Sequence, residues 1–326
     1  MSEITPPDRY PGARPFADTE PDRLLFFGRD RELAELLNRF LSVNLLVLYG
    51  KSGLGKTSLL QAGLFPQLRE RDLLPLPVRL NRPELALMTV LTEEVEKSCA
   101  AVGIDYTPGE TTGLWEFFKT AVFWREDNLQ TPVLILDQFE EIFTLQSVDS
   151  RHWLAHELGD LSGGRLPQRV RERFQVEKKV PYSDKPPAVK IILSLREDYL
   201  GALQELSVDA PQIWDNRFRL TPLSRVQARL AVVEPARLDV GLFSTRTFVY
   251  EDNAVEEMLT FLGGKSGEIE PFQLQVLCRQ IEQKVQHEQA EGKQNIRVDR
   301  TYRGGRQAME RILQWFITGV PVGVFL

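Results

Sequence analysis

Eight consecutive residues have the types and the spacing of a loop that binds phosphate groups. They match the pattern G-x-x-x-x-G-K-[ST] at every position: Gly50-Lys51-Ser52-Gly53-Leu54-Gly55-Lys56-Thr57. Glycines let the backbone curl so that its N–H groups point at phosphate oxygens, and the N-terminus of a following helix adds partial positive charge. Lys56 is then expected to reach the β- and γ-phosphates, and Thr57 to ligate Mg²⁺. We call these residues the phosphate loop and expect a nucleotide to contact them and the adjacent Ser58.

A second group of residues that could do chemistry is acidic. Asp137 ends the apolar run Val133–Leu136, and Gln138, Phe139, Glu140 and Glu141 follow it. A carboxylate at the tip of a neighbouring strand can hold the water shell of Mg²⁺, which we expect of Asp137. Glu140 or Glu141 could orient or deprotonate an attacking water. Alternatively, both are first-turn acids of the next helix, where the helix dipole favours negative charge.

Arg196 ends a third apolar run. Ligands of open α/β sheets bind at the edge where the carboxyl ends of the strands meet, so we expect Arg196 at that edge. A guanidinium there can bind the γ-phosphate or stabilise charge that develops during transfer. The alternative is a salt bridge to Glu197, to Asp198 or to the acids after Asp137. Arg217 is a weaker candidate, for which structural pairing is the favoured interpretation.

The apolar pattern predicts the elements that position these residues. Short apolar runs predict buried parallel strands at residues 45–49, 133–136 and 189–195, with weaker strands at 78–80 and 218–220. Helical spacing predicts helices at residues 29–40, 84–102 and 113–124, and one from Lys56 that stops near Pro66. Strands that alternate with helices indicate an α/β fold with a parallel sheet.

A change of pattern divides the chain into three parts. Residues 1–25 are rich in proline and are expected to form an extended arm. Residues 26–224 carry the alternating strands and helices, with a surface insert at residues 162–187. Residues 225–326 show no convincing strand, and we predict an all-α domain with helices at residues 225–231, 253–262, 272–291 and 306–316.

The composition is that of an ordinary globular protein, with 42% hydrophobic and 26% charged residues. A net charge of -6 gives no general attraction to nucleic acid, and the basic residues between Arg165 and Lys179 are interpreted as a solvated face. No apolar run has the length of a membrane helix, no signal peptide is recognised, and two cysteines are too few for a disulfide framework. These features favour a cytoplasmic protein that binds neither membrane nor nucleic acid.

Several segments resemble one protein family in their order along the chain. Residues 26–33 read FFGRDREL, the phosphate loop follows, and residues 134–143 read LILDQFEEIF. The next segments are ILSLREDYLGAL at residues 192–203, NRF at residues 216–218 and L-x-P-L at residues 220–223. Together they resemble the STAND class of signal-transduction ATPases, most closely the bacterial novel STAND group, which is related to NACHT and NB-ARC switches. The resemblance covers residues 8–318.

The resemblance implies a three-layer P-loop NTPase fold of the additional-strand type, followed by a helical lid domain. It also implies that Phe27, Gly28 and Arg29 border the adenine of ATP or ADP, and that Pro271 contacts the nucleotide from the lid. The chain departs from the family in one of these places, because the glycine usual two residues before that proline is Ile269 here.

For catalysis, the resemblance implies roles for five residues: Lys56, Asp137, Glu140, Glu141 and Arg196. Arg196 corresponds to the family's sensor arginine at a strand end. Gln138 directly follows Asp137, so the sequence does not decide whether Glu140 or Glu141 is the catalytic base.

The function implied is an ATP-driven switch that hydrolyses ATP slowly. ADP would hold the closed state, and ATP would favour an open, oligomerising state, in bacterial defence or regulation. A sensor or effector partner is expected, because no repeat sensor, effector or complete winged helix follows the helical domain. The chain therefore looks like a module of a longer protein or a shortened member. The alternatives are a DNA-acting ATPase or loader of the AAA type and a scaffold that binds nucleotide without hydrolysis.

Overall fold

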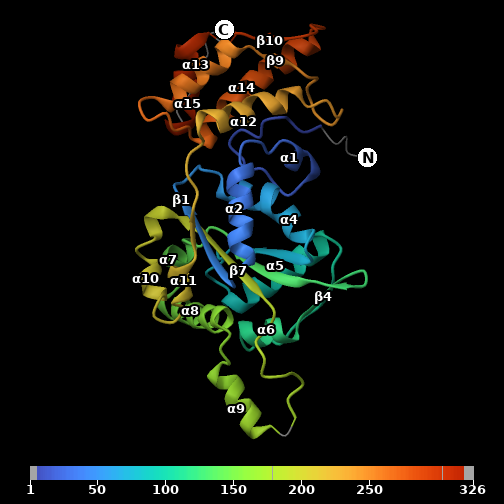
Figure 1. The fold of residues 1–326 in the computed structure, drawn as a ribbon, viewed down its shortest axis with the longest axis vertical. Coiled ribbons are helices and arrows are strands. Elements are labelled where there is room, and N and C mark those ends of the chain that lie inside the picture. Colours follow the sequence, from blue (N-terminus) through green and yellow to red (C-terminus); the bar gives the residue numbers. More distant parts are fainter. Residues whose placement is uncertain (1–5, 178, 303, 319–326) are drawn as a thin grey trace. The chain divides into compact units, whose positions relative to one another are not determined.

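The computed structural model describes residues 6–177, 179–302 and 304–318, and their contacts divide the chain into two compact units (Figure 1). The first, which we call the sheet unit, comprises Ala34–Lys51 and Leu64–Leu220. The second, the helical unit, comprises Met1–Leu33, Ser52–Gly63 and Thr221–Leu326. The phosphate loop therefore leaves the sheet unit after Lys51 and continues in the helical unit. The predicted boundaries at residues 25 and 224 stay predictions.

The sheet unit is built on a five-stranded sheet with the strand order β2-β6-β7-β1-β8. The strands are β1 (Leu45–Gly50), β2 (Leu73–Val78), β6 (Thr131–Leu136), β7 (Lys190–Arg196) and β8 (Arg217–Arg219). Every neighbouring pair in this sheet is parallel, so the carboxyl ends of all five strands lie at one edge. The predicted parallel α/β fold is confirmed.

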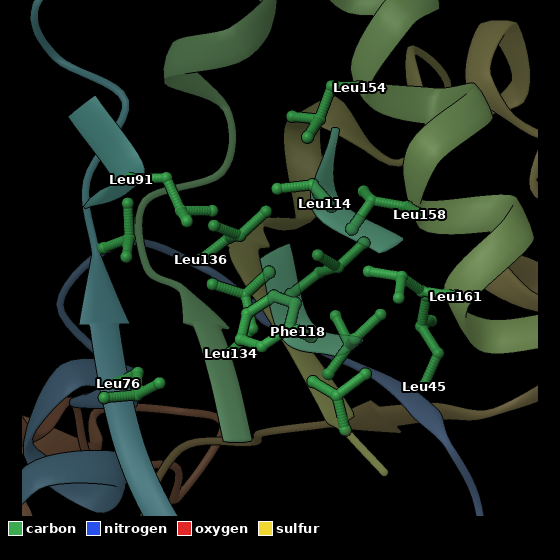
Figure 2. Close-up of a cluster of buried hydrophobic side chains, with 14 of the residues drawn as sticks. Leu45, Leu76, Leu91, Leu114, Phe118, Leu134, Leu136, Leu154, Leu158 and Leu161 are labelled. Carbon is green, nitrogen blue, oxygen red and sulfur yellow. The ribbon is translucent and has the colours of Figure 1, made fainter. Parts of the chain in front are cut away.

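One face of this sheet is covered by three helices, α5 (Leu87–Ala101), α6 (Leu114–Thr120) and α8 (Val148–Gly163). Figure 2 shows their leucines and Phe118 packed against strand residues such as Leu45, Leu76 and Leu134. Leu46 and Leu48 alternate with Leu45 and are equally buried, as expected for a strand covered on both faces.

Helix α2 (Asp30–Leu41) ends beside the start of β7. The Lys190 ammonium donates hydrogen bonds to the carbonyls of Leu41 and Val43, at 3.1 and 2.5 Å. A cation at this position satisfies carbonyls that the helix end leaves without partners.

The remaining elements of the sheet unit are short. A three-stranded antiparallel sheet contains β3 (Asp105–Thr107), β4 (Val122–Arg125) and β5 (Asn128–Leu129). The helices are α4 (Phe65–Arg69), α7 (Glu141–Leu145), α9 (Gln168–Val176), a 3₁₀ turn (Glu197–Tyr199), α10 (Leu203–Leu206) and α11 (Gln212–Asp215).

The helical unit has its own apolar core. It contains α12 (Arg225–Arg237), α13 (Asp252–Gly263), α14 (Pro271–Ala290) and α15 (Gly305–Thr318), with the short strands β9 (Val249–Tyr250) and β10 (Arg297–Val298). Val232, Val255 and Leu277 are fully buried in this core. Tyr10 of the N-terminal arm is also part of it, so the arm is packed into the unit rather than extended into solvent.

Several boundaries predicted from the sequence were wrong, and prolines explain two of them. The strand predicted at residues 78–80 lies at Leu73–Val78, because β2 is an edge strand and tolerates Pro75 and Pro77. The helix from Lys56, predicted to stop near Pro66, continues to Arg69. It is α-helical at Lys56–Ser58 (α3), π-helical at Leu59–Leu64, and continues as α4 with the proline in its first turn.

Three further predictions need correction. The helix predicted at residues 113–124 ends at Thr120, and the β-branched and aromatic residues Val122, Phe123 and Trp124 pair as a strand with β3. The arm is not extended throughout, since Glu20–Leu24 forms a short helix, α1. The helical domain was expected to hold no strand, but it contains the two-residue strands β9 and β10.

Candidate functional site

Two glycines of the phosphate loop have left-handed backbone conformations in the helical unit. The φ angles of Gly53 and Gly55 are 77° and 86°, a region that side chains other than hydrogen disfavour. Gly55 is the N-cap of α3, and Lys56 is the first residue of that helix. Ser52 and Gly53 are exposed, and Gly55, Lys56 and Thr57 are half-buried. The loop thus has the glycine-dependent turn and the following helix start that phosphate binding requires.

The start of α14 contacts this loop. A Cβ atom added at Gly53 would lie 3.3 Å from the Cβ of Phe272, a tight contact, and the φ of 77° also favours glycine here. Phe272 directly follows Pro271, which occupies the first turn of α14. The structure therefore brings the start of α14, which contains Pro271, next to the phosphate loop.

Arg29 is buried against the same loop. Its side chain is 5% exposed, its Nη2 donates to the carbonyl of Leu54 at 3.2 Å, and its Nη1 pairs with Glu32 at 2.7 Å. Burial lowers the pKa of Arg29, and the hydrogen bond that Arg29 donates to Glu32 opposes that effect. Through these contacts the Arg29 side chain fixes the backbone of the phosphate loop at Leu54.

The segment before Arg29 lies close to the first turn of α12. Gly28 has a φ of 87°, and a Cβ atom there would lie 2.4 Å from the carbonyl oxygen of Gln227. The Gln227 side chain donates to both carboxylate oxygens of Glu32, at 2.8 and 2.7 Å. Gln227 also forms the capping box of α12 with Ser224. Phe27 precedes this contact and is half-buried.

Ser58 is used by the N-terminal arm. Its side chain is buried, and its Oγ accepts a hydrogen bond from the backbone N–H of Phe16 at 3.1 Å. Phe16 packs with Leu25 and Ala62 in a small apolar cluster. The Ser58 hydroxyl thus fastens the arm to the helix that follows the phosphate loop.

In the sheet unit, the predicted acidic residues lie at the carboxyl edge of the sheet. Asp137 directly follows β6, and its backbone N–H donates to the carbonyl of Val78 at 3.2 Å. The backbone N–H of Phe139 donates to the carbonyl of Ser194 in β7 at 2.8 Å. Between them, Gln138 has a φ of 54°, unusual for a residue with a side chain. Neighbouring strand ends on both sides therefore fix the turn after Asp137.

The two glutamates of this turn have different partners. The Oε2 of Glu140 accepts a hydrogen bond from the backbone N–H of Arg196 at 3.2 Å. Glu141 forms an ion pair with Arg79, which also contacts Gln138. Arg196 lies opposite Gly50, the last residue of β1, so the structure brings Glu140, Arg196 and the start of the phosphate loop to the same edge.

The two arginines considered as candidates for phosphate contact, Arg196 and Arg217, make other contacts in the structure. The Arg196 side chain pairs with Asp198 at 2.5 Å, and this hydrogen bond raises the pKa of Arg196. That pairing is the alternative that the sequence left open. The Arg217 guanidinium lies 4.7 Å from the centre of the Trp214 ring, a cation–π contact that accounts for its position.

Comparison with known proteins decides the family. The family model of Novel STAND NTPase 1 matches residues 9–289. The chain belongs to this family. A search of curated proteins gives no match. Within the part that the structure describes, every helix is too short or too polar to cross a bilayer.

This Novel STAND NTPase 1 member is similar in fold to solved P-loop ATPases. The ORC2 protein of Aeropyrum pernix, described as ADPNP-ADP complexes, has a TM-score of 0.52 and 14% identity, over 96% of this chain and 70% of that chain. A Walker-type ATPase of Pyrococcus abyssi has a TM-score of 0.51 and 17% identity, over 86% of this chain and 75% of that chain. At these identities the likeness concerns the fold alone.

Three polar residues of this Novel STAND NTPase 1 site were missed from the sequence: Arg79, Glu32 and Gln227. Glu32 belongs to the FFGRDREL segment and could have been singled out there. Gln227 lies three residues after Ser224, which is the spacing of a capping box. Arg79 was hidden because the preceding strand was placed too late in the chain.

Proposed function

We propose that this chain binds ATP and ADP with Mg²⁺ at the phosphate loop and hydrolyses ATP slowly, as a nucleotide-dependent switch. The observation that carries this proposal is the backbone of Gly53 and Gly55, which is left-handed directly before the helix that starts at Lys56. Such a turn directs successive N–H groups toward one bound anion. Membership of an NTPase family and the P-loop ATPase fold support the same conclusion.

The residues present fit a nucleotide with Mg²⁺. Lys56 supplies the ammonium that contacts the β- and γ-phosphates, and the backbone N–H groups of the loop surround them. The Thr57 hydroxyl and the Asp137 carboxylate are oxygen donors, which Mg²⁺ prefers, in part through its water shell. Bound Mg²⁺ neutralises charge that develops on the phosphates.

The remaining predicted residues are assigned by their surroundings. Phe27 and Gly28 would border the adenine, with Arg29 fixing the loop through the carbonyl of Leu54. Pro271 would contact the nucleotide from the start of α14, next to the Phe272 side chain. Arg196 would exchange Asp198 for the γ-phosphate, a more highly charged partner.

The test is the nucleotide content of the desalted protein, followed by titration with fluorescent mant-ADP and mant-ATP in the presence of Mg²⁺. We expect bound ADP in the purified protein and binding that Lys56→Ala abolishes. Lys97→Ala is the matched control, because Lys97 is an exposed lysine that pairs only loosely with Glu94, at 3.8 Å. Nucleotide binding by Lys56→Ala equal to that of the Lys97→Ala control would contradict the site.

The switching part of the proposal concerns states of assembly and a protein partner. We expect ADP to favour the monomer and a non-hydrolysable ATP analogue to favour self-association, with a sensor or effector protein or domain as the source of the signal. Light scattering of the chain with either nucleotide measures this directly. Equal masses in both nucleotides would argue against a nucleotide-controlled assembly.

The alternative that the sequence left open is a DNA-acting ATPase or loader. Against it, three of the four arginines of the insert form ion pairs, among them Arg165 with Asp160 at 3.1 Å. Arg169 binds Glu116 and Glu157, and Arg173 binds Glu110 and Glu177. ATP turnover measured with and without duplex DNA separates the two functions. Stimulation by DNA that weakens as salt is raised would favour the alternative.

A further inference from the structure

Strand pairing places Arg79 at the carboxyl edge of the sheet. Val78, the last residue of β2, is the register partner of Leu136, the last residue of β6. The next residues in the two strands are Arg79 and Asp137, so they emerge side by side. The hydrogen bond from the backbone N–H of Asp137 to the carbonyl of Val78 closes this contact at 3.2 Å.

The Arg79 guanidinium joins two side chains of the turn that follows Asp137. Its Nη2 contacts the amide oxygen of Gln138 and the Oε1 of Glu141. The Glu141 side chain is 14% exposed, and its Oε2 is buried with no hydrogen-bond partner among the described residues. Arg79 thus holds Oε1 of Glu141, and Oε2 is shielded from solvent.

Glu140 is held differently. Among the described residues its carboxylate has one hydrogen bond, through Oε2 to the backbone N–H of Arg196, and the residue is half-buried. That contact orients Glu140 along the carboxyl edge without neutralising its charge. A carboxylate in this situation can accept a proton from water, whereas a carboxylate paired with an arginine is occupied.

We propose that Arg79 is a positioning residue for ATP hydrolysis, which holds Gln138 and Glu141 so that Glu140 is the carboxylate that handles the attacking water. This inference rests on the proposed function. In the step, the water oxygen attacks the γ-phosphorus and the bond from that phosphorus to the bridging oxygen breaks. The electron pair leaves with ADP, and the water proton passes to Glu140 and then to solvent, so that ADP and phosphate are the products.

The first test compares phosphate release by the full chain and by two arginine variants. For Arg79→Ala we expect kcat to fall about 10- to 100-fold, because Glu141 is then an unpaired carboxylate that competes with Glu140 for the attacking water, with KM changed less than about twofold. Arg82→Ala is the matched control. Arg82 lies three residues later and also pairs with two glutamates, Glu93 and Glu94, but on α5. Its kcat should equal that of the wild type.

The second test distinguishes a positioning role from a merely structural one. Glu140→Gln should lower kcat by at least about 100-fold. The fold-loss of kcat on Glu141→Gln should be at least about ten times smaller than that on Glu140→Gln. Adding Glu141→Gln to Arg79→Ala should restore the kcat of Glu141→Gln alone, because no unpaired carboxylate then remains beside Glu140. A structural loss would instead make the two effects additive. Binding of mant-ADP and circular dichroism show that each variant is folded.

The outcomes separate the two proposals. A wild-type rate equal to that of Lys56→Ala overturns the proposed function and, with it, the role of Arg79. A measurable wild-type rate that Arg79→Ala leaves unchanged overturns the role of Arg79 alone. A loss on Glu141→Gln as large as that on Glu140→Gln overturns the assignment of Glu140.

Discussion

Arg29 and Leu54 are joined by a hydrogen bond of 3.2 Å, from the guanidinium Nη2 to a carbonyl in the middle of the phosphate loop. Because Arg29 also pairs with Glu32, and Glu32 accepts two hydrogen bonds from Gln227, a continuous chain of polar contacts runs from the loop to the first turn of α12. All four residues belong to the helical unit. We expect these contacts to couple nucleotide binding to the packing of α12.

The ion pair at the centre of this chain is buried, so breaking it should be costly. Glu32→Ala leaves the guanidinium of Arg29, 5% exposed, without its carboxylate, and we expect a loss of about 3–5 kcal/mol in the free energy of unfolding. Glu35→Ala is the control, because its pair with Arg39 is exposed and is worth about 1 kcal/mol or less. Urea denaturation followed by circular dichroism measures both. Equal losses would show that the burial of Arg29 has no energetic consequence.

Removing the last contact of the chain should affect nucleotide release more than stability. Gln227→Leu deletes two hydrogen bonds to Glu32 and the capping-box bond from the backbone N–H of Ser224, and we expect ADP to dissociate about tenfold faster, which corresponds to about 1.4 kcal/mol. Gln289→Leu is the control, since it deletes two hydrogen bonds with the backbone of Arg246. Stopped-flow displacement of mant-ADP gives the rates. Unchanged release in Gln227→Leu would argue against coupling through this path.

The insert at residues 162–187 should contribute to the stability of the sheet unit. Arg169 of α9 pairs with Glu116 and Glu157, whose side chains are 4% and 2% exposed. Arg169→Leu leaves two buried carboxylates together, and we expect a loss of at least about 3–5 kcal/mol. Arg173→Leu removes pairs that are more exposed and should cost much less than Arg169→Leu. Denaturation curves of the two variants that coincide would contradict this prediction.

The parts of the site that depend on local sequence could be predicted. Glycines in the phosphate loop predict a left-handed backbone there, and the apolar run before them predicts a buried strand. The structure has both, in Gly53 and Gly55 and in β1. Asp137 and Arg196 were placed at the carboxyl edge for the same reason, since each directly ends an apolar run. These predictions require no knowledge of distant contacts.

Contacts between distant segments could not be predicted. Arg79 reaches Glu141 only because β2 pairs with β6, and two prolines hid the extent of β2. The pairing of Arg196 with Asp198 rather than with another acid depends on the conformation of the turn after β7, which residue types do not determine. The buried contact of Arg9 with Glu282 joins residues 273 positions apart, and no local pattern indicates it.

Glu282 makes the stability of the helical unit depend on pH. Its side chain is fully buried and accepts hydrogen bonds from the backbone N–H groups of Arg9 and Tyr10, at 2.7 and 3.1 Å, and from the Thr245 hydroxyl at 3.0 Å. Burial raises the pKa of Glu282 above its ordinary value of 4.5, and the hydrogen bonds from the two backbone N–H groups oppose this. Asp8 raises the pKa further, and Arg279 lies 3.3 Å from the carboxylate.

A raised pKa means that the folded state holds the proton of Glu282 more tightly than the unfolded state does. The stability from this group is therefore complete below pH 4.5 and is lost as the pH rises from 4.5 through the higher pKa of the folded state. The amide side chain of the Glu282→Gln variant does not titrate, so the free energy of unfolding of this variant should fall less over that pH range than that of the wild type. The difference in free energy of unfolding between the wild type and the variant should therefore shrink as the pH rises. Urea denaturation of both proteins at a series of pH values tests this, with Glu288→Gln on the same helix as the control. A difference between wild type and Glu282→Gln that stays constant with pH would show that the carboxylate ionises as readily in the folded chain as in the unfolded one.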